Sequence, residues 1–165
     1  MKTESDTYTI RPSTPNDLGA VDALLARTYP KLLKADYPPS VLVTALPIIS
    51  RARPELLACG TYYVAEEDGQ ILGAGGWTRD RKEPRLGHIR HVVTDDRQLR
   101  RGIGRALMQR SFHKARASGV ICMECWATYT AQAFYTSVGF RTIGPMDVPL
   151  AGGISFPSLR MLRDL

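Results

Sequence analysis

Residues 97–105, called the cradle loop below, combine positive charge with glycine: Arg97, Arg100, Arg101, Gly102, Gly104 and Arg105. An apolar stripe from Leu107 to Ala115 predicts an amphipathic helix that starts at the second glycine and ends before Gly119. A helix N-terminus exposes unpaired N–H groups, and glycine lets a phosphate approach them closely. We therefore expect the cradle loop to bind an anion, above all a phosphate. A tight turn with a solvated basic face is the alternative at this point.

Two common phosphate-binding loops fit this stretch poorly. The sequence has no Gly-x-x-x-x-Gly-Lys-Ser/Thr, which argues against a P-loop. A dinucleotide fingerprint would need a third glycine where Leu107 stands, although Glu124 lies at the spacing of a ribose-binding acid. A nicotinamide-binding domain remains a weaker alternative.

Regular elements are predicted on both sides of the cradle loop. β-Branched residues predict a strand that ends near Thr94. The other expected strands are residues 8–11, 61–65, 71–77, 120–126, 140–143 and 155–162, and the other helices are residues 18–29, 41–49 and 130–138. This order predicts a mixed α/β layer fold. Residues 30–54 are punctuated by proline, and residues 1–7 are predicted to be a flexible tail.

Two motifs resemble the GNAT acetyltransferase superfamily. Residues 92–96 followed by 100–107 resemble its acyl-CoA signature, Gln/Arg-x-x-Gly-x-Gly/Ala, with Leu99 at the Gln/Arg position. Residues 131–140 resemble its Asn-x-x-Ala-x-x-x-Tyr-x-x-x-Gly-Phe segment, with Thr128 where the asparagine is usual. The resemblance covers most of the chain and implies an α/β fold whose mixed, mostly antiparallel sheet is flanked by helices, formed by residues 8–165 as one domain.

The resemblance also implies a binding site for acetyl-CoA as co-substrate. The strand before the cradle loop would hold the pantetheine arm, and the loop amides would hold the pyrophosphate. The residues expected to bind the co-substrate are Val92, Val93, Thr94, Leu99, Arg100, Arg101, Gly102, Ile103, Gly104, Arg105, Thr128, Ala131, Phe134 and Tyr135. Leu99 and Thr128 depart from the usual pattern, so Arg100 or Arg101 would supply the phosphate contact that Leu99 cannot make.

Acetyl transfer to an amine needs a general base, a general acid and a hydrogen-bond donor that stabilises the oxyanion. Tyr135 matches the family tyrosine that protonates the leaving thiolate. His88 is the preferred base and Glu124 the reserve, while His91, at an odd separation from His88, is expected on the opposite face of an unbulged strand. A backbone N–H near Val92 or Val93 would donate a hydrogen bond to the oxyanion.

Composition narrows the protein class further. The 165 residues carry a net charge of +6, with 44% hydrophobic and 23% charged residues, which is typical of a soluble globular protein. We expect neither nucleic acid nor membrane as a partner, because the basic residues are scattered among few aromatics and no apolar run is long enough to span a bilayer. Cytoplasmic location follows from the apparent lack of a signal peptide. Cys122 and Cys125 are expected to be packed thiols rather than a metal site.

These observations predict an acetyl-CoA-dependent N-acyltransferase that acts on a primary amine of a small molecule or peptide. The alternative is a sensor module of the same fold that binds acyl-CoA without turnover. The sequence leaves the oligomeric state open, with a homodimer as one option.

Overall fold

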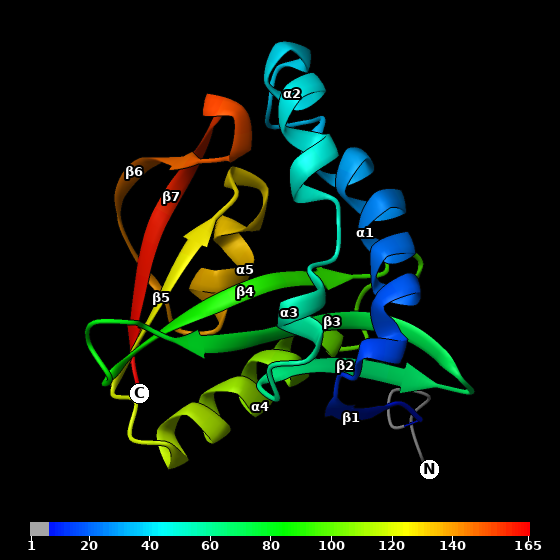
Figure 1. Ribbon diagram of the computed structural model, residues 1–165, viewed down its shortest axis with the longest axis vertical. Coiled ribbons are helices and arrows are strands. Elements are labelled where there is room, and N and C mark those ends of the chain that lie inside the picture. The colour runs from blue at the N-terminus through cyan, green and yellow to red at the C-terminus, as the bar shows by residue number, and fades with distance from the viewer. Residues whose placement is uncertain (1–6) are drawn as a thin grey trace.

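The computed structural model describes residues 7–165, so nearly all of the predicted N-terminal tail lies outside the described residues (Figure 1). Its helices are α1 (Leu18–Leu33), α2 (Pro39–Ile49), α3 (Pro54–Leu57), α4 (Ile103–Ala117) and α5 (Gln132–Ser137). Its strands are β1 (Thr9–Pro12), β2 (Tyr62–Glu67), β3 (Gln70–Arg79), β4 (Leu86–Thr94), β5 (Cys122–Ala127), β6 (Arg141–Pro149) and β7 (Ser155–Asp164).

All seven strands form one sheet in the order β1-β2-β3-β4-β5-β7-β6. Every neighbouring pair is antiparallel except β4 and β5, which are parallel. This arrangement confirms the predicted mixed, mostly antiparallel sheet. The β5–β7 and β6–β7 pairings form the left part of Figure 1, beside the crossing β2–β4 strands.

Helices cover both faces of the sheet (Figure 1). On one face, α1 and α3 pack on alternate residues of β2 to β4, in a cluster that includes Val21, Leu25 and Tyr62. On the other face, α4 buries the predicted apolar stripe, including Leu107 and Phe112, against the sheet and against residues 135–140. Burial of these faces supplies the apolar area that stabilises the fold.

A bulge interrupts β4 just before its end. Gly76 of β3 lies opposite Arg90 and Ala74 lies opposite Val93, so β4 carries one residue more than β3 in this interval. His91 sits in the bulge with φ of +47°. The extra residue shifts the alternation of side chains, so that His88 and His91 line the same cavity. The expectation that the two histidines lie on opposite faces was wrong for this reason.

The bulge leaves two carbonyl groups that tyrosines satisfy. The Tyr62 hydroxyl donates to the carbonyl oxygen of His91 at 2.7 Å, and the Tyr29 hydroxyl donates to that of Val92 at 3.1 Å. Strands β4 and β5 pair only from Leu86 to His88. Beyond His88 the two strands separate, which opens the middle of the sheet.

Two predicted boundaries fell short. Helix α1 continues past Pro30, because Leu33 and Tyr37 beyond it pack against β7 and α2 in a third apolar cluster that outweighs the lost hydrogen bond. The final strands form one long β6–β7 hairpin in which Pro149 lies opposite Ser155, so the strand that was predicted to end at residue 143 continues to Pro149.

The glycines of β3 mark places where other segments approach the strand. A Cβ atom on Gly76 would lie 2.3 Å from the carbonyl oxygen of Thr61, and one on Gly73 would lie 2.8 Å from the Ile103 side chain. Glycine weakens a strand but removes the Cβ atoms that would block these contacts. The first turn of α4 can therefore sit directly on the sheet.

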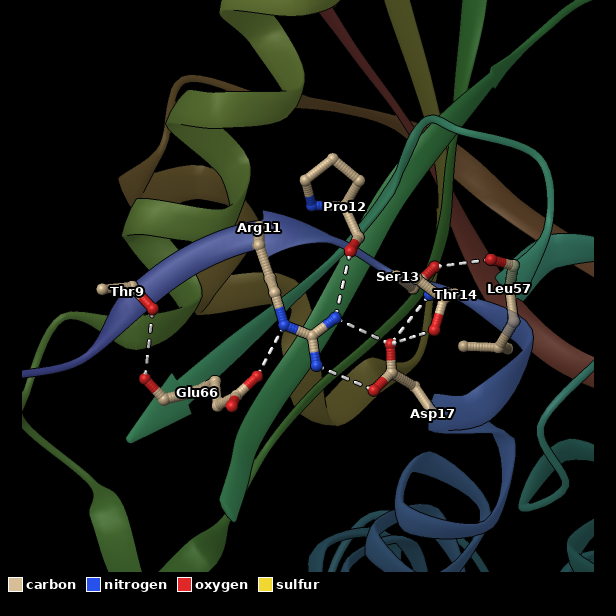
Figure 2. A network of polar contacts seen from close by, with 8 residues as sticks. All are labelled: Thr9, Arg11, Pro12, Ser13, Thr14, Asp17, Leu57 and Glu66. Atoms are coloured by element: carbon tan, nitrogen blue, oxygen red, sulfur yellow. Dashed lines mark hydrogen bonds and ion pairs between the residues drawn. The ribbon is translucent and has the colours of Figure 1, made fainter. Parts of the chain in front are cut away.

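A polar network fixes the start of α1 (Figure 2). The Arg11 guanidinium donates to both carboxylate oxygens of Asp17, at 2.9 and 2.8 Å, and to Glu66. The Asp17 carboxylate also accepts the backbone N–H of Thr14 at 2.8 Å. The hydrogen bond from Arg11 lowers the pKa of Asp17, so this link between β1, β2 and the helix persists at acidic pH.

No helix within residues 7–165 is long and apolar enough to cross a membrane. The same residues contain no group of three or more His, Cys, Asp or Glu side chains that could hold a metal ion.

Candidate active site

A cavity of about 1020 Å³ occupies the opening between β4 and β5. It is bordered by the ends of β4 and β5, the cradle loop, α5, the C-terminal parts of α1 and α2, and the β6–β7 hairpin. All the predicted co-substrate and catalytic residues line it: His88, Val92, Val93, Thr94, Leu99, Arg100, Arg101, Gly102, Ile103, Gly104, Arg105, Thr128, Ala131, Phe134 and Tyr135. Residues from three segments, β4, the cradle loop and residues 128–135, are thus brought to one place.

The two glycines of the cradle loop have different structural roles. Gly102 is the residue before α4 and has φ of +71°, a conformation that strongly favours glycine. Gly104 packs against Phe134 of α5, whose ring lies 3.1 Å from the position of a Cβ atom. Gly104 therefore lets α4 and α5 approach each other closely at the cavity wall.

The arginines of the cradle loop are divided between structural contacts and the solvent. Arg97 pairs with Asp95, and Arg101 pairs with Glu67 at 2.6 Å and donates to Gln98 at 2.8 Å. Among the described residues, Arg105 donates a single long hydrogen bond, of 3.4 Å, to Ser137 O. Arg100 is exposed, has φ of +68° and has no polar partner within residues 7–165. Arg100 is therefore the guanidinium most available to an anion at this loop.

Leu99 and Thr128, the two residues that depart from the family pattern, both line the cavity. The Leu99 side chain is 62% exposed at the cavity edge, so it leaves room for a ligand but offers no hydrogen bond. The Thr128 hydroxyl accepts the backbone N–H of Ala131 at 3.2 Å and so caps the turn that precedes α5.

Tyr135 is buried in the floor of the cavity, between Phe134 and Phe140. Burial, aided by the neighbouring Cys125 thiol, raises the pKa of the Tyr135 phenol well above its usual value. The phenol is therefore fully protonated at neutral pH.

His88 is held by a carboxylate. Its Nε2 atom lies 2.7 Å from Oδ1 of Asp80, whose other oxygen accepts the N–H groups of Lys82 and Glu83 at 2.9 Å. The hydrogen bond from His88 holds the pKa of Asp80 well below its ordinary range. When Nε2–H donates to Asp80, Nδ1 of a neutral ring carries the free lone pair.

The other two candidate bases, His91 and Glu124, already form hydrogen bonds within the protein. The Nε2–H group of His91 donates to the carbonyl oxygen of Ile49 at 2.8 Å, and burial lowers the pKa of this imidazole. Glu124 accepts hydrogen bonds from Arg160 at 2.9 Å and from Trp126 at 2.8 Å. Burial raises the pKa of Glu124, but these hydrogen bonds outweigh it and lower the pKa overall.

Sequence reasoning missed the part of the cavity wall formed by α1, α2 and the β6–β7 hairpin. Phe156 of this wall stacks on the ring of Tyr37 at a centroid distance of 4.6 Å, and Tyr37 stacks in turn on Tyr129 at 4.9 Å. The Tyr37 hydroxyl donates to Pro157 O at 2.7 Å and accepts the backbone N–H of Tyr129 at 2.9 Å. The only local signal was the proline punctuation of residues 30–54, which does not reveal these long-range partners.

Comparison with known families identifies the class of protein. Residues 58–142 match the profile of a family described as acetyltransferase (GNAT) domain. This match spans just over half of the chain and includes β4, the cradle loop and all of α5. The chain therefore belongs to the GNAT acetyltransferase family. No curated protein sequence gives a significant match.

Solved structures share the whole fold at low sequence identity. A GCN5-related N-acetyltransferase from Rhodopseudomonas palustris has a TM-score of 0.77 and 18% identity, with full coverage of both chains. The PaiA N-acetyltransferase from Thermoplasma acidophilum, in complex with coenzyme A, has a TM-score of 0.72 and 12% identity, covering 96% of this chain and 99% of that one. N-acetylglutamate synthase from Neisseria gonorrhoeae, with coenzyme A and N-acetyl-glutamate, has a TM-score of 0.66 and 17% identity over 96% of this chain but 35% of that chain.

Proposed function

We propose that the protein transfers an acetyl group from acetyl-CoA directly to a primary amine. The observation that carries this proposal is the convergence of the cradle loop, the end of β4, Tyr135 and His88 on one cavity between separated strands. The solved relatives that contain coenzyme A support the choice of co-substrate.

The residues around the cavity suit a CoA thioester. The start of α4 offers unpaired amides and Arg100 offers a guanidinium to the pyrophosphate. The backbone of Val92 to Thr94, beyond the point where β4 leaves β5, is available to the pantetheine arm. The thioester supplies the activated acyl group.

Each chemical step has a candidate residue. His88, oriented by Asp80, takes a proton from the acceptor amine as the amine nitrogen forms a bond to the acyl carbon. A backbone N–H of Val92 or Val93, at the bulge, donates to the oxygen that becomes negative. As the carbon–sulfur bond breaks, Tyr135 gives its proton to the thiolate. Its raised pKa keeps that proton in place until the thiolate forms.

Two measurements test this proposal. Acetyl-CoA and CoA should raise the melting temperature and NAD should not, because a ligand specific for the folded state stabilises it by mass action. Thiol release should then be screened with primary amines, and Tyr135→Phe should lower kcat about 100-fold while retaining its acetyl-CoA affinity. No thermal shift at saturating acetyl-CoA would overturn the proposal. A shift without thiol release for any amine would favour the sensor alternative.

A further inference from the structure

A second cavity of about 570 Å³ adjoins the first and is distinctly basic. The two cavities share Arg53, Leu56, His88, Arg90 and Trp126. Residues 78–82 also line the second cavity. His88 and Arg90 therefore lie where the two cavities adjoin, and both are open to an acceptor bound there.

Arg90 has spare hydrogen-bonding capacity. Its side chain is partly buried, and Nε donates to the Thr78 hydroxyl at 2.8 Å. Its two terminal nitrogens, which carry four N–H groups, have no acceptor within residues 7–165. Neither terminal nitrogen is among the buried polar atoms that lack a partner, so a ligand in the cavity can reach both of them.

The carboxylates near Arg90 are committed to other groups. Asp80 is bound by His88 and by two backbone amides, and Glu124 is bound by Arg160 and Trp126. Glu55 pairs with Arg53 at the surface. These carboxylates offset part of the positive charge, but none forms an ion pair with Arg90.

We propose that Arg90 binds a carboxylate on the acceptor, so that the substrates are small amines that also carry a carboxylate, such as amino acids. This inference rests on the proposed acetyl transfer. The planar guanidinium suits two parallel hydrogen bonds to a carboxylate. His88 and Arg90 are two residues apart on one strand, about 7 Å along the chain. An amino acid is long enough to reach both.

The same positive charge helps to prepare the amine. Burial, and after it the charges of Arg53 and Arg81, lower the pKa of Arg90, while Asp80 and Glu124 oppose this shift in part. A protonated amine in this region would meet the same repulsion, which lowers its pKa and favours the neutral nucleophile. The carboxylate of the substrate would thus give binding energy, while the basic surroundings assist deprotonation.

The decisive experiment compares an amino acid with its carboxamide and its decarboxylated amine as acceptors. We expect kcat/KM to be about 10- to 100-fold higher for the carboxylate. Arg90→Gln should lower kcat/KM for the carboxylate far more than for the carboxamide and so remove this preference, and Arg90→Lys should restore it only in part. Arg116→Gln is the matched control, because exposed Arg116 of α4 lines neither cavity.

Several results would overturn the inference and leave acetyl transfer intact. One is equal turnover of the three acceptors by the wild-type enzyme, and another is the same preference in Arg90→Gln. A third is weaker binding of acetyl-CoA by Arg90→Gln, because Arg90 would then bind the co-substrate and not the acceptor. A fourth is a preference of the wild-type enzyme for amines that carry a phosphate instead of a carboxylate. If no acceptor is turned over, the affinity of the CoA complex for N-acetyl amino acids should be compared with its affinity for their carboxamides. Equal affinities would contradict a carboxylate-binding site at Arg90. Failure to bind acetyl-CoA at all would instead overturn the proposed function.

Discussion

Nε2 of His88 and Oδ1 of Asp80 lie 2.7 Å apart, at the border between the two cavities. Asp80 belongs to the segment after β3, and His88 belongs to β4, so the pair joins two consecutive elements across a short loop. Backbone amides hold the second oxygen of Asp80, which makes it a fixed support for the imidazole.

This pair predicts a graded loss of activity. His88→Gln should lower kcat about 100-fold, because general base catalysis is worth at least that factor. Asp80→Asn should cause a smaller loss, since the base remains but its tautomer is no longer fixed. Both variants should bind acetyl-CoA normally in a thermal titration. Full activity of His88→Gln would show that water or another group takes the proton.

The ion pair between Arg101 and Glu67 should control the cradle loop. The hydrogen bond from Arg101 lowers the pKa of Glu67 to about 2, so this contribution to stability is complete above the unfolded-state pKa of about 4.3 and is lost as the pH falls toward 2. Glu67→Gln should raise the KM for acetyl-CoA several-fold at neutral pH, because the loop loses its anchor.

Asp68→Asn is the matched control for this variant. It removes the neighbouring exposed carboxylate at a residue with φ of +51°, a conformation that asparagine tolerates. An equal change in KM for both variants would mean that general surface charge, and not the anchor, matters.

His91 should make folding sensitive to mild acid. Burial lowers the pKa of His91, so the unfolded chain binds a proton at a higher pH than the folded chain does. Stability should therefore fall as the pH drops below about 6.5, with a slope of at most about 1.4 kcal/mol per pH unit. His91→Asn, which suits the positive φ, should flatten this slope between pH 7 and 5, measured by urea unfolding.

The control for His91 is His113→Asn on the exposed face of α4, which should keep the wild-type slope. An unchanged slope in His91→Asn would contradict the assignment.

Two glycine substitutions should have opposite effects on stability. Gly76→Ala places a Cβ atom 2.3 Å from Thr61 O and 2.5 Å from the Tyr62 Cα, so backbone must move, at a cost of about 1–3 kcal/mol. Gly19→Ala, in α1 with no atom within 4 Å of the new Cβ, should stabilise by about 0.5–1 kcal/mol. Thermal unfolding measures both. A neutral Gly76→Ala would show that the approach of β2 to β3 is not tight.

Sequence patterns were sufficient for the local elements of the site. The stripe from Leu107 to Ala115 predicted α4, and its burial against the sheet is confirmed, because helical periodicity depends only on residues close in sequence. The glycines that precede this helix and the motif around Tyr135 predicted which segments would share one cavity. The order of the elements predicted a mixed α/β fold, and the resemblance to the GNAT superfamily implied the mixed, mostly antiparallel sheet.

Tertiary structure decided what depends on partners distant in sequence. The bulge at His91 arises from the register between β3 and β4 and from the hydroxyls of Tyr29 and Tyr62, so the alternation within β4 alone placed His91 on the wrong face. Which arginine of the cradle loop forms an ion pair and which is exposed likewise depends on the position of Glu67, which pairs with Arg101. Spacing along the chain determines periodicity, whereas side-chain contacts between separate strands and helices exist only once the sheet is assembled.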